Sequence, residues 1–261
     1  MRHLYALVAV VLVSGTAAAQ TLLEFNVASA TNNPTFLAPT NQALNVSASN
    51  LTAGPGLDPD GFWNGTNSLL LANNFTNAGT PDANDYFQFG VTPQGGASIT
   101  YSTLSYALFR ENAAAAGTQF IGPGSWQLQY SLDGFATAGN VLDNMSVPVG
   151  GAFSLNQVSF NSDVSAVGTQ AGTVTFRFFG FNRTGSNALS AGGFGNGTGE
   201  VFATGGNWEG TGSDVILTGT VSAVPEPATI GLLAVSVGIG GVWTWRHRSK
   251  LAELQQAKLK K

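Results

Sequence analysis

The chain has 261 residues, no cysteine and a formal net charge of −4, which excludes a disulfide framework and any thiolate-based centre. Between residues 20 and 222 it has twelve acidic residues against three arginines and no lysine or histidine, which is a net charge of −9. This balance excludes a broad basic surface, so we expect no nucleic acid among its partners.

Residues 1–19 have the pattern of a secretory signal peptide. A short basic lead is followed by an unbroken apolar run at 4–13 and by Ala17-Ala18-Ala19, which fits the A-x-A cleavage pattern. The apolar run is too short for a transmembrane helix, which needs about 20 apolar residues. The sequence therefore predicts export and a mature chain that begins at Gln20.

Residues 20–222 are predicted to form one β domain. Short runs in which apolar and polar residues alternate are separated by Gly, Pro, Asn and Asp, as in strands joined by turns. Strands are predicted at 22–27, 44–49, 68–72, 86–92, 99–110, 125–131, 153–161, 173–181 and 214–222. Because no βαβ alternation or fixed repeat is present, we expect an all-β fold, an antiparallel two-sheet β-sandwich that is jelly-roll-like.

The alternation also predicts which side chains are buried. Phe87, Phe89 and Val91 share one face of their strand, and Trp126 alternates with glutamines and is expected in the core. By contrast, the segment 180–212 is rich in Gly, Asn, Thr and Ser. It is predicted to be a long loop or an irregular sheet edge.

Catalytic chemistry in the β domain is limited by its missing residue types. Without histidine or cysteine, residues 20–222 form no Ser-His-Asp triad, Cys-His dyad or histidine zinc site. Glycoside hydrolysis needs only two carboxylates, and Glu24, Glu111, Glu200, Glu209 and the aspartates are candidates that no motif pairs. We therefore expect no catalytic residues and no enzyme, with a carboxylate-dependent glycoside hydrolase as the alternative.

Calcium is the only cofactor that the composition suggests, as a structural ion. Calcium binds several oxygen ligands and accepts loop carbonyls. The oxygen-rich candidates are the loops at 58–61 and 82–85, the pair Asp143-Asn144, and Glu24 with Asp214 on the first and last strands. None has the spacing of an EF-hand, and the same residues also form Asx turns, so the metal ligands stay unknown.

Two tryptophans are candidates for binding an extracellular polysaccharide. Trp63 and Trp208 lie in segments rich in Gly and Asn, where an exposed indole ring could stack on a sugar. Arg177 lies among phenylalanines within a predicted strand, and we expect it to make cation–π contacts or an ion pair.

The C-terminal part is predicted to cross a membrane. Residues 228–245 contain no charge and no proline, and as a helix they would span about 27 Å, close to the thickness of a bilayer core. Arg246, Arg248 and Lys250 follow directly and stop the segment by the positive-inside rule. We expect a cytoplasmic tail at 249–261 and the β domain on the other side of the membrane.

The motif Pro225, Glu226 and Pro227 precedes this helix. The order of Pro-Glu-Pro, apolar helix and arginine-rich end, in a chain that begins with a secretion signal, resembles the PEP-CTERM sorting signal over residues 223–248. That signal belongs to Gram-negative bacteria that produce exopolysaccharide. The resemblance implies recognition of the motif by an exosortase, a membrane-embedded cysteine transpeptidase that processes the tail. One departure is that this chain continues past its arginines to Lys261.

The sequence as a whole predicts an exported protein that is first anchored in the inner membrane, with its domain in the periplasm. It would then reach the cell surface or the extracellular matrix, where the domain has a structural or glycan-binding role. A simpler alternative is a membrane-anchored surface protein whose tail is never processed.

Overall fold

A computed structural model describes residues 18–27, 35–59, 69–112, 121–149, 154–184, 192–195 and 214–222. Contacts divide the chain into two compact units, Met1–Ser222 and Ala223–Lys261, and every described residue belongs to the first. The sorting motif and the predicted helix at 228–245 lie outside the described residues, as do residues 1–17. Within the described ranges, no helix is long and apolar enough to cross a membrane.

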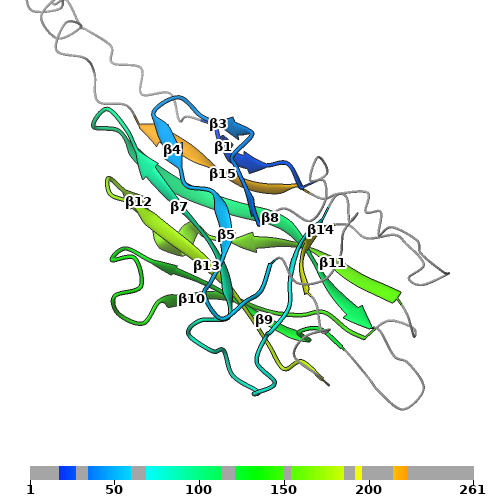
Figure 1. Ribbon diagram of the computed structural model, residues 1–261. Helices are drawn as coiled ribbons and strands as arrows, with labels where there is room; N and C mark the ends of the chain where they lie inside the picture. The colour runs from blue at the N-terminus through cyan, green and yellow to red at the C-terminus, as the bar shows by residue number, and fades with distance from the viewer. Residues whose placement is uncertain are drawn as a thin grey trace, which may run out of the picture. The chain divides into compact units, whose positions relative to one another are not determined.

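The described residues form an all-β fold of two antiparallel sheets (Figure 1). The eight-stranded sheet has the order β3-β1-β15-β8-β14-β6, with β11 and β12 also paired to β8. Its strands are β1 (Gln20–Phe25), β3 (Asn41–Gln42), β6 (Leu69–Ala72), β8 (Ser98–Asn112), β11 (Ser154–Asp163), β12 (Thr169–Gln170), β14 (Gly192–Gly195) and β15 (Val215–Ser222).

The seven-stranded sheet has the order β10-β9-β13-β7-β5-β2, and β4 also pairs with β7. Its strands are β2 (Phe36–Leu37), β4 (Val46–Ala48), β5 (Leu51–Ala53), β7 (Tyr86–Pro93), β9 (Ser125–Ser131), β10 (Asn140–Ser146) and β13 (Val174–Phe181). A short 3-10 helix, η2 (Ser165–Val167), joins β11 to β12.

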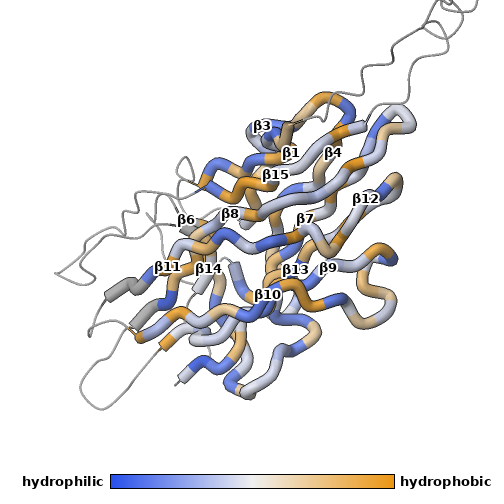
Figure 2. Tube along the Cα trace, turned by 180° about the vertical axis from the view of Figure 1, so that it is seen from behind, coloured by the Kyte–Doolittle hydropathy of each residue, from blue (hydrophilic) through white to orange (hydrophobic). Residues whose placement is uncertain are grey.

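Period-two alternation divides each sheet into a core face and an outer face. Phe87, Phe89 and Val91 are fully buried, as the sequence predicts, while Gln88 between them is half-buried. Trp126 is also fully buried, which confirms its expected place in the core. Hydrophilic and hydrophobic positions follow one another along such strands in Figure 2. Because only one face of each strand is apolar, the two sheets bury those faces against each other.

Aromatic rings from both sheets meet in the core. Tyr106 of β8 and Phe194 of β14 each lie 4.9 Å, centroid to centroid, from Phe178 of β13, in edge-to-face geometry. Phe25 of β1 packs on Phe89 of β7 at 5.3 Å in the same way. These contacts cross from one sheet to the other, so they establish the fold as a β-sandwich with one continuous core.

All nine predicted strands are present, with ends that differ by a few residues. The prediction for 180–212 needs correction, because β14 at Gly192–Gly195 pairs with both β6 and β8. Glycine-rich sequence hides this strand, since three of its four residues have no side chain to show alternation. Glycine is required at position 193, where a Cβ would lie 2.0 Å from the carbonyl oxygen of Leu70.

Candidate functional site

The outer face of the seven-stranded sheet carries polar and aromatic side chains across β7, β13 and β9. Arg177 of β13 lies opposite Gln88 of β7 on one side and Gln129 of β9 on the other. In the next row, Phe179 of β13 lies opposite Tyr86 of β7. Residues two apart on a strand project from the same face, so these side chains form one patch. The sheet thus holds a cation beside two rings and two amides.

The β9–β10 loop, residues 132–139, is tied together by Asp133. The Ser131 hydroxyl donates to Asp133 Oδ1 at 2.6 Å, and the hydroxyl and N–H of Thr137 donate to Oδ2 at 2.7 and 3.1 Å. The backbone N–H groups of Asp133 and Phe135 donate back to Ser131 Oγ. The bonds from Ser131 and then Thr137 favour the carboxylate and lower the pKa of Asp133 to about 2. An ionised carboxylate therefore fixes the loop.

This loop turns Phe135 back over the sheet. Gly134 and Phe135 both have positive φ, 71° and 66°, which is ordinary for glycine but uncommon for a bulky residue. Gly139 makes room for the ring, because a Cβ there would lie 2.4 Å from Phe135 Cε1 and 2.7 Å from Gln129 Oε1. A phenylalanine in the left-handed backbone conformation is strained, so the surrounding contacts must stabilise it. Strained backbone positions of this kind are concentrated at binding sites.

Arg177 lies between aromatic rings. Its guanidinium carbon is 3.8 Å from the centroid of the Tyr86 ring and 4.1 Å from that of Phe135, which confirms the expected cation–π contact. Its Nε donates to Gln88 Oε1 at 3.0 Å. Partial burial lowers the pKa of Arg177, and the neighbouring Tyr86 hydroxyl opposes this effect. The group still carries its charge at neutral pH, since arginine does not lose its proton in proteins.

These side chains line a pocket of about 450 Å³. Its other walls come from the segment before β7 and from the β9–β10 loop. The lining residues are Pro81, Asp82, Ala83, Gln129, Phe135, Ala136, Thr137, Ala138, Gly139, Arg177 and Phe179. The pocket therefore offers ring surface, a guanidinium, an amide, a hydroxyl and one carboxylate. Ligand sites have this composition, with apolar walls and a few placed polar groups.

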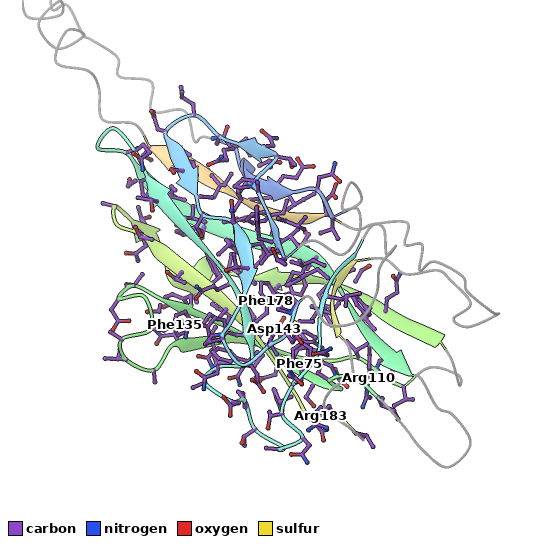
Figure 3. All side chains as sticks on the ribbon, viewed as in Figure 1. Phe75, Arg110, Phe135, Asp143, Phe178 and Arg183 are labelled. Carbon is purple, nitrogen blue, oxygen red and sulfur yellow. The ribbon has the colours of Figure 1, made fainter. Side chains whose placement is uncertain are left out.

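The other two arginines of the domain have structural partners and lie apart from Phe135 (Figure 3). Arg110 is buried on β8, where its Nε donates to the Gly122 carbonyl at 2.8 Å and its Nη1 to that of Val147 at 3.3 Å. Burial lowers the pKa of Arg110.

Arg183 donates to the Phe75 carbonyl, and its charge favours the ionised form of buried Asp85. Burial, followed by repulsion from Asp82, nevertheless raises the pKa of Asp85.

A buried hydrogen-bond chain uses Asp143, one of the calcium candidates. Ser162 of β11 donates to Asp143 Oδ2 of β10 at 2.6 Å, and the Tyr106 hydroxyl of β8 lies 2.7 Å from Ser162 Oγ. Burial raises the pKa of Tyr106, which keeps this hydroxyl protonated, and Met145 Sδ lies 2.5 Å from it as a further acceptor. This series of hydrogen bonds links the two sheets, and it gives Asp143 a structural role.

The remaining metal candidates form no cluster of three acidic side chains within the described residues, and residues 60 and 61 of the 58–61 loop lie outside them. Glu24 lies opposite Ile216 where β1 pairs with β15, and Asp82 Oδ1 accepts the Asn84 N–H at 2.8 Å in an Asx turn. In the described part of the chain, no group of three or more acidic side chains is placed to hold a metal ion.

The predicted sugar platforms and tail residues cannot be placed on this structure. Trp63 and Trp208 lie outside the described residues, as do Pro225, Glu226, Pro227, Arg246, Arg248 and Lys250. The pocket residues Phe135 and Gln129 were missed, as was Tyr86 beside Arg177, because nothing in the sequence shows that β7, β9 and β13 are neighbours in one sheet. The one signal in the sequence was the turn pair Asp133-Gly134, which is followed directly by the aromatic residue Phe135.

Comparisons with known proteins add little to this site. No protein-family model and no curated protein matches the chain. A solved structure of a carbohydrate-binding module specific for non-crystalline cellulose aligns with 61% of this chain and 80% of its own, at 10% sequence identity and a TM-score of 0.29. A likeness at that level carries no functional argument.

Proposed function

We propose that this protein is an exported, glycan-binding surface or matrix protein, and that the pocket beside Arg177 is its binding site. The single observation that supports binding is the seating of Arg177 between Tyr86 and Phe135 in a pocket of about 450 Å³. Sugars present hydroxyl groups on their edges and C–H groups on their faces. Gln129, Thr137 and Asp82 can exchange hydrogen bonds with hydroxyls, while the rings offer apolar contact.

The role is binding without catalysis. Among the lining residues only Asp82 is a carboxylic acid, whereas retaining and inverting glycoside hydrolases use two. The polar side chains otherwise available are amide, hydroxyl and guanidinium, which hold a ligand without exchanging a proton with it at neutral pH.

Removal of the Phe135 ring is expected to weaken polysaccharide binding. Phe135→Ala deletes one wall of the pocket and one face of the Arg177 stack, and we expect roughly a tenfold loss of affinity, as for an aromatic anchor in an interface. Affinity would be measured with the full-length protein against the exopolysaccharide of its own bacterium. Leu132→Ala is the matched control, because Leu132 is 55% exposed in the same loop and does not line the pocket. Equal losses in the two variants would contradict a site at the pocket.

The localisation that we propose is based on the N-terminal and C-terminal sequences. In this proposal a jelly-roll-like β-sandwich at 20–222 lies between a signal peptide at 1–19 and the sorting signal at 223–248, and an exosortase processes the tail at Pro225-Glu226-Pro227. The support is the order of motif, apolar run and arginines in the sequence.

Processing predicts the mass of the mature protein in its bacterium. A form that begins near Gln20 and ends near Pro227 is expected in the matrix or medium. Intact-mass analysis of separated cell fractions measures this directly. A form that keeps residues 228–261 and stays with the membrane would show that the tail is an ordinary anchor.

A further inference from the structure

We infer that the pocket beside Arg177 selects acidic sugars, with the guanidinium of Arg177 binding a uronic acid carboxylate. This inference rests on the proposed glycan-binding function and adds the chemical class of the ligand. It begins from the directions in which Arg177 can still form bonds. The centroids of the Tyr86 and Phe135 rings lie 3.8 and 4.1 Å from its carbon, so the space around that carbon is largely taken by aromatic contacts.

The edge of the guanidinium is the part left for a ligand. Its Nε is used by Gln88, and no hydrogen bond from either Nη atom to the described residues accompanies that contact. Two Nη groups held in a plane form a fork that matches the two oxygens of a carboxylate. The two ring contacts and the bond to Gln88 hold the guanidinium in place in advance, so little side-chain entropy is lost on binding.

Arg177 also lacks a counter-ion in the described part of the chain. Burial is the main cause that lowers the pKa of Arg177. Its one hydrogen bond to a described side chain goes to the neutral amide of Gln88, not to a carboxylate. The Asp133 carboxylate is already bound by Ser131 and Thr137. A partly desolvated cation without a partner is costly, and a ligand carboxylate would supply the missing charge.

The sugar part of the ligand is specified by the neighbours of Arg177. Gln129 and Thr137 line the same pocket and suit hydroxyl groups, while Phe179 offers an apolar wall. Because the domain has a net charge of −9, an acidic polymer is not attracted from a distance. Recognition therefore depends on close contact at this one cation.

The test compares one polymer in two charge states. Full-length protein is titrated with oligomers of glucuronic acid and with the same oligomers after their carboxyl groups are reduced to alcohols. We expect the acidic form to bind about ten- to a hundredfold more tightly, the range for a charge-assisted hydrogen-bonded pair. The comparison uses the native chain on both sides, so it does not depend on how any variant folds.

Variants then assign the preference to Arg177. Arg177→Gln is expected to remove the preference for the acidic form, and Arg177→Lys to keep only part of it, because lysine has the charge without the fork. Thr175→Ala is the control, since Thr175 lies on the same face of β13 and does not line the pocket. A preference that survives Arg177→Gln would overturn the assignment to this residue.

The other outcomes separate the two claims. Equal binding of acidic and reduced oligomers would overturn the inference and leave glycan binding intact. Absence of binding to either oligomer, and to the bacterium's own exopolysaccharide, would overturn both. In competition, methyl glucuronide should displace the oligomer better than acetate at equal ionic strength. Equal displacement by the two competitors would show a carboxylate site with no selectivity for sugars.

Discussion

Phe178→Ala is expected to destabilise the domain by about 3–5 kcal/mol, a large part of the total stability of a typical domain. Phe178 is fully buried and contacts Tyr106 and Phe194 of the opposite sheet at 4.9 Å each, in edge-to-face geometry. Its removal deletes apolar contacts between the sheets and leaves a cavity that the rigid strands cannot close. Urea unfolding of the full-length protein, followed by tryptophan fluorescence, measures the change.

The control for this variant is a phenylalanine outside the core. Phe36 is 49% exposed, so Phe36→Ala should change the free energy of unfolding by about 1 kcal/mol or less. The same small effect at both positions would mean that Phe178 does not join the sheets as described.

Gly219→Ala is expected to cost about 3 kcal/mol, because its methyl group would meet the backbone of the neighbouring strand. A Cβ at this position would lie 2.2 Å from the carbonyl oxygen of Thr100 and 2.8 Å from Leu22 Cδ1. Gly219 stands where the register of β15 against β8 shifts. A carbonyl group within a sheet cannot rotate away, so β15 would have to move from β8. The thermal midpoint of the full-length protein should fall clearly.

A second glycine tests whether this effect comes from the clash. Gly172 lies between β12 and β13, and nothing is within 4 Å of a Cβ built on it. Gly172→Ala should therefore be neutral or slightly stabilising, since alanine lowers the entropy of the unfolded chain. If both alanines lower the midpoint equally, the close packing of β15 on β8 is wrong.

The fold was largely predictable because its strands follow simple alternation. The pattern of β7, with Phe87, Phe89 and Val91 inward, can be seen without knowing the partner strands. Six strands were missed, and four of them, β2, β3, β5 and β12, are only two or three residues long, too short to show alternation. The other two, β14 and β10, were missed for a different physical reason. The first is mostly glycine, and the second is an edge strand whose side chains are largely exposed, so neither shows a regular apolar face.

The candidate site was much less predictable, because it depends on contacts between distant parts of the chain. The sequence predicted a cation–π contact or an ion pair for Arg177, and the cation–π contact is present, but its partner rings were not predicted. Its partner rings come from β7 and from the β9–β10 loop, and only the strand register brings them together. The left-handed conformation of Phe135 has no sequence signal that would distinguish it from an ordinary turn residue.

The pocket is built from two parts, the paired strands beneath it and the β9–β10 loop that covers one side. Paired strands hold Arg177 and Phe179, while the bonds of Asp133 and the space at Gly139 hold Phe135 above them. A site that is formed before the ligand arrives loses less entropy on binding. The glycan binding that we propose for this pocket is consistent with the export to the cell surface or the matrix that the sequence predicts.

Hydrogen–deuterium exchange of the full-length protein, with and without the exopolysaccharide that we propose as its ligand, tests the central claim most directly. We expect slower exchange in peptides that cover residues 132–139 and 81–85, which border the pocket, and no change in β1 or β15 of the opposite sheet. Protection confined to the segments that contain Trp63 and Trp208 would contradict the pocket as the binding site and favour those tryptophans instead.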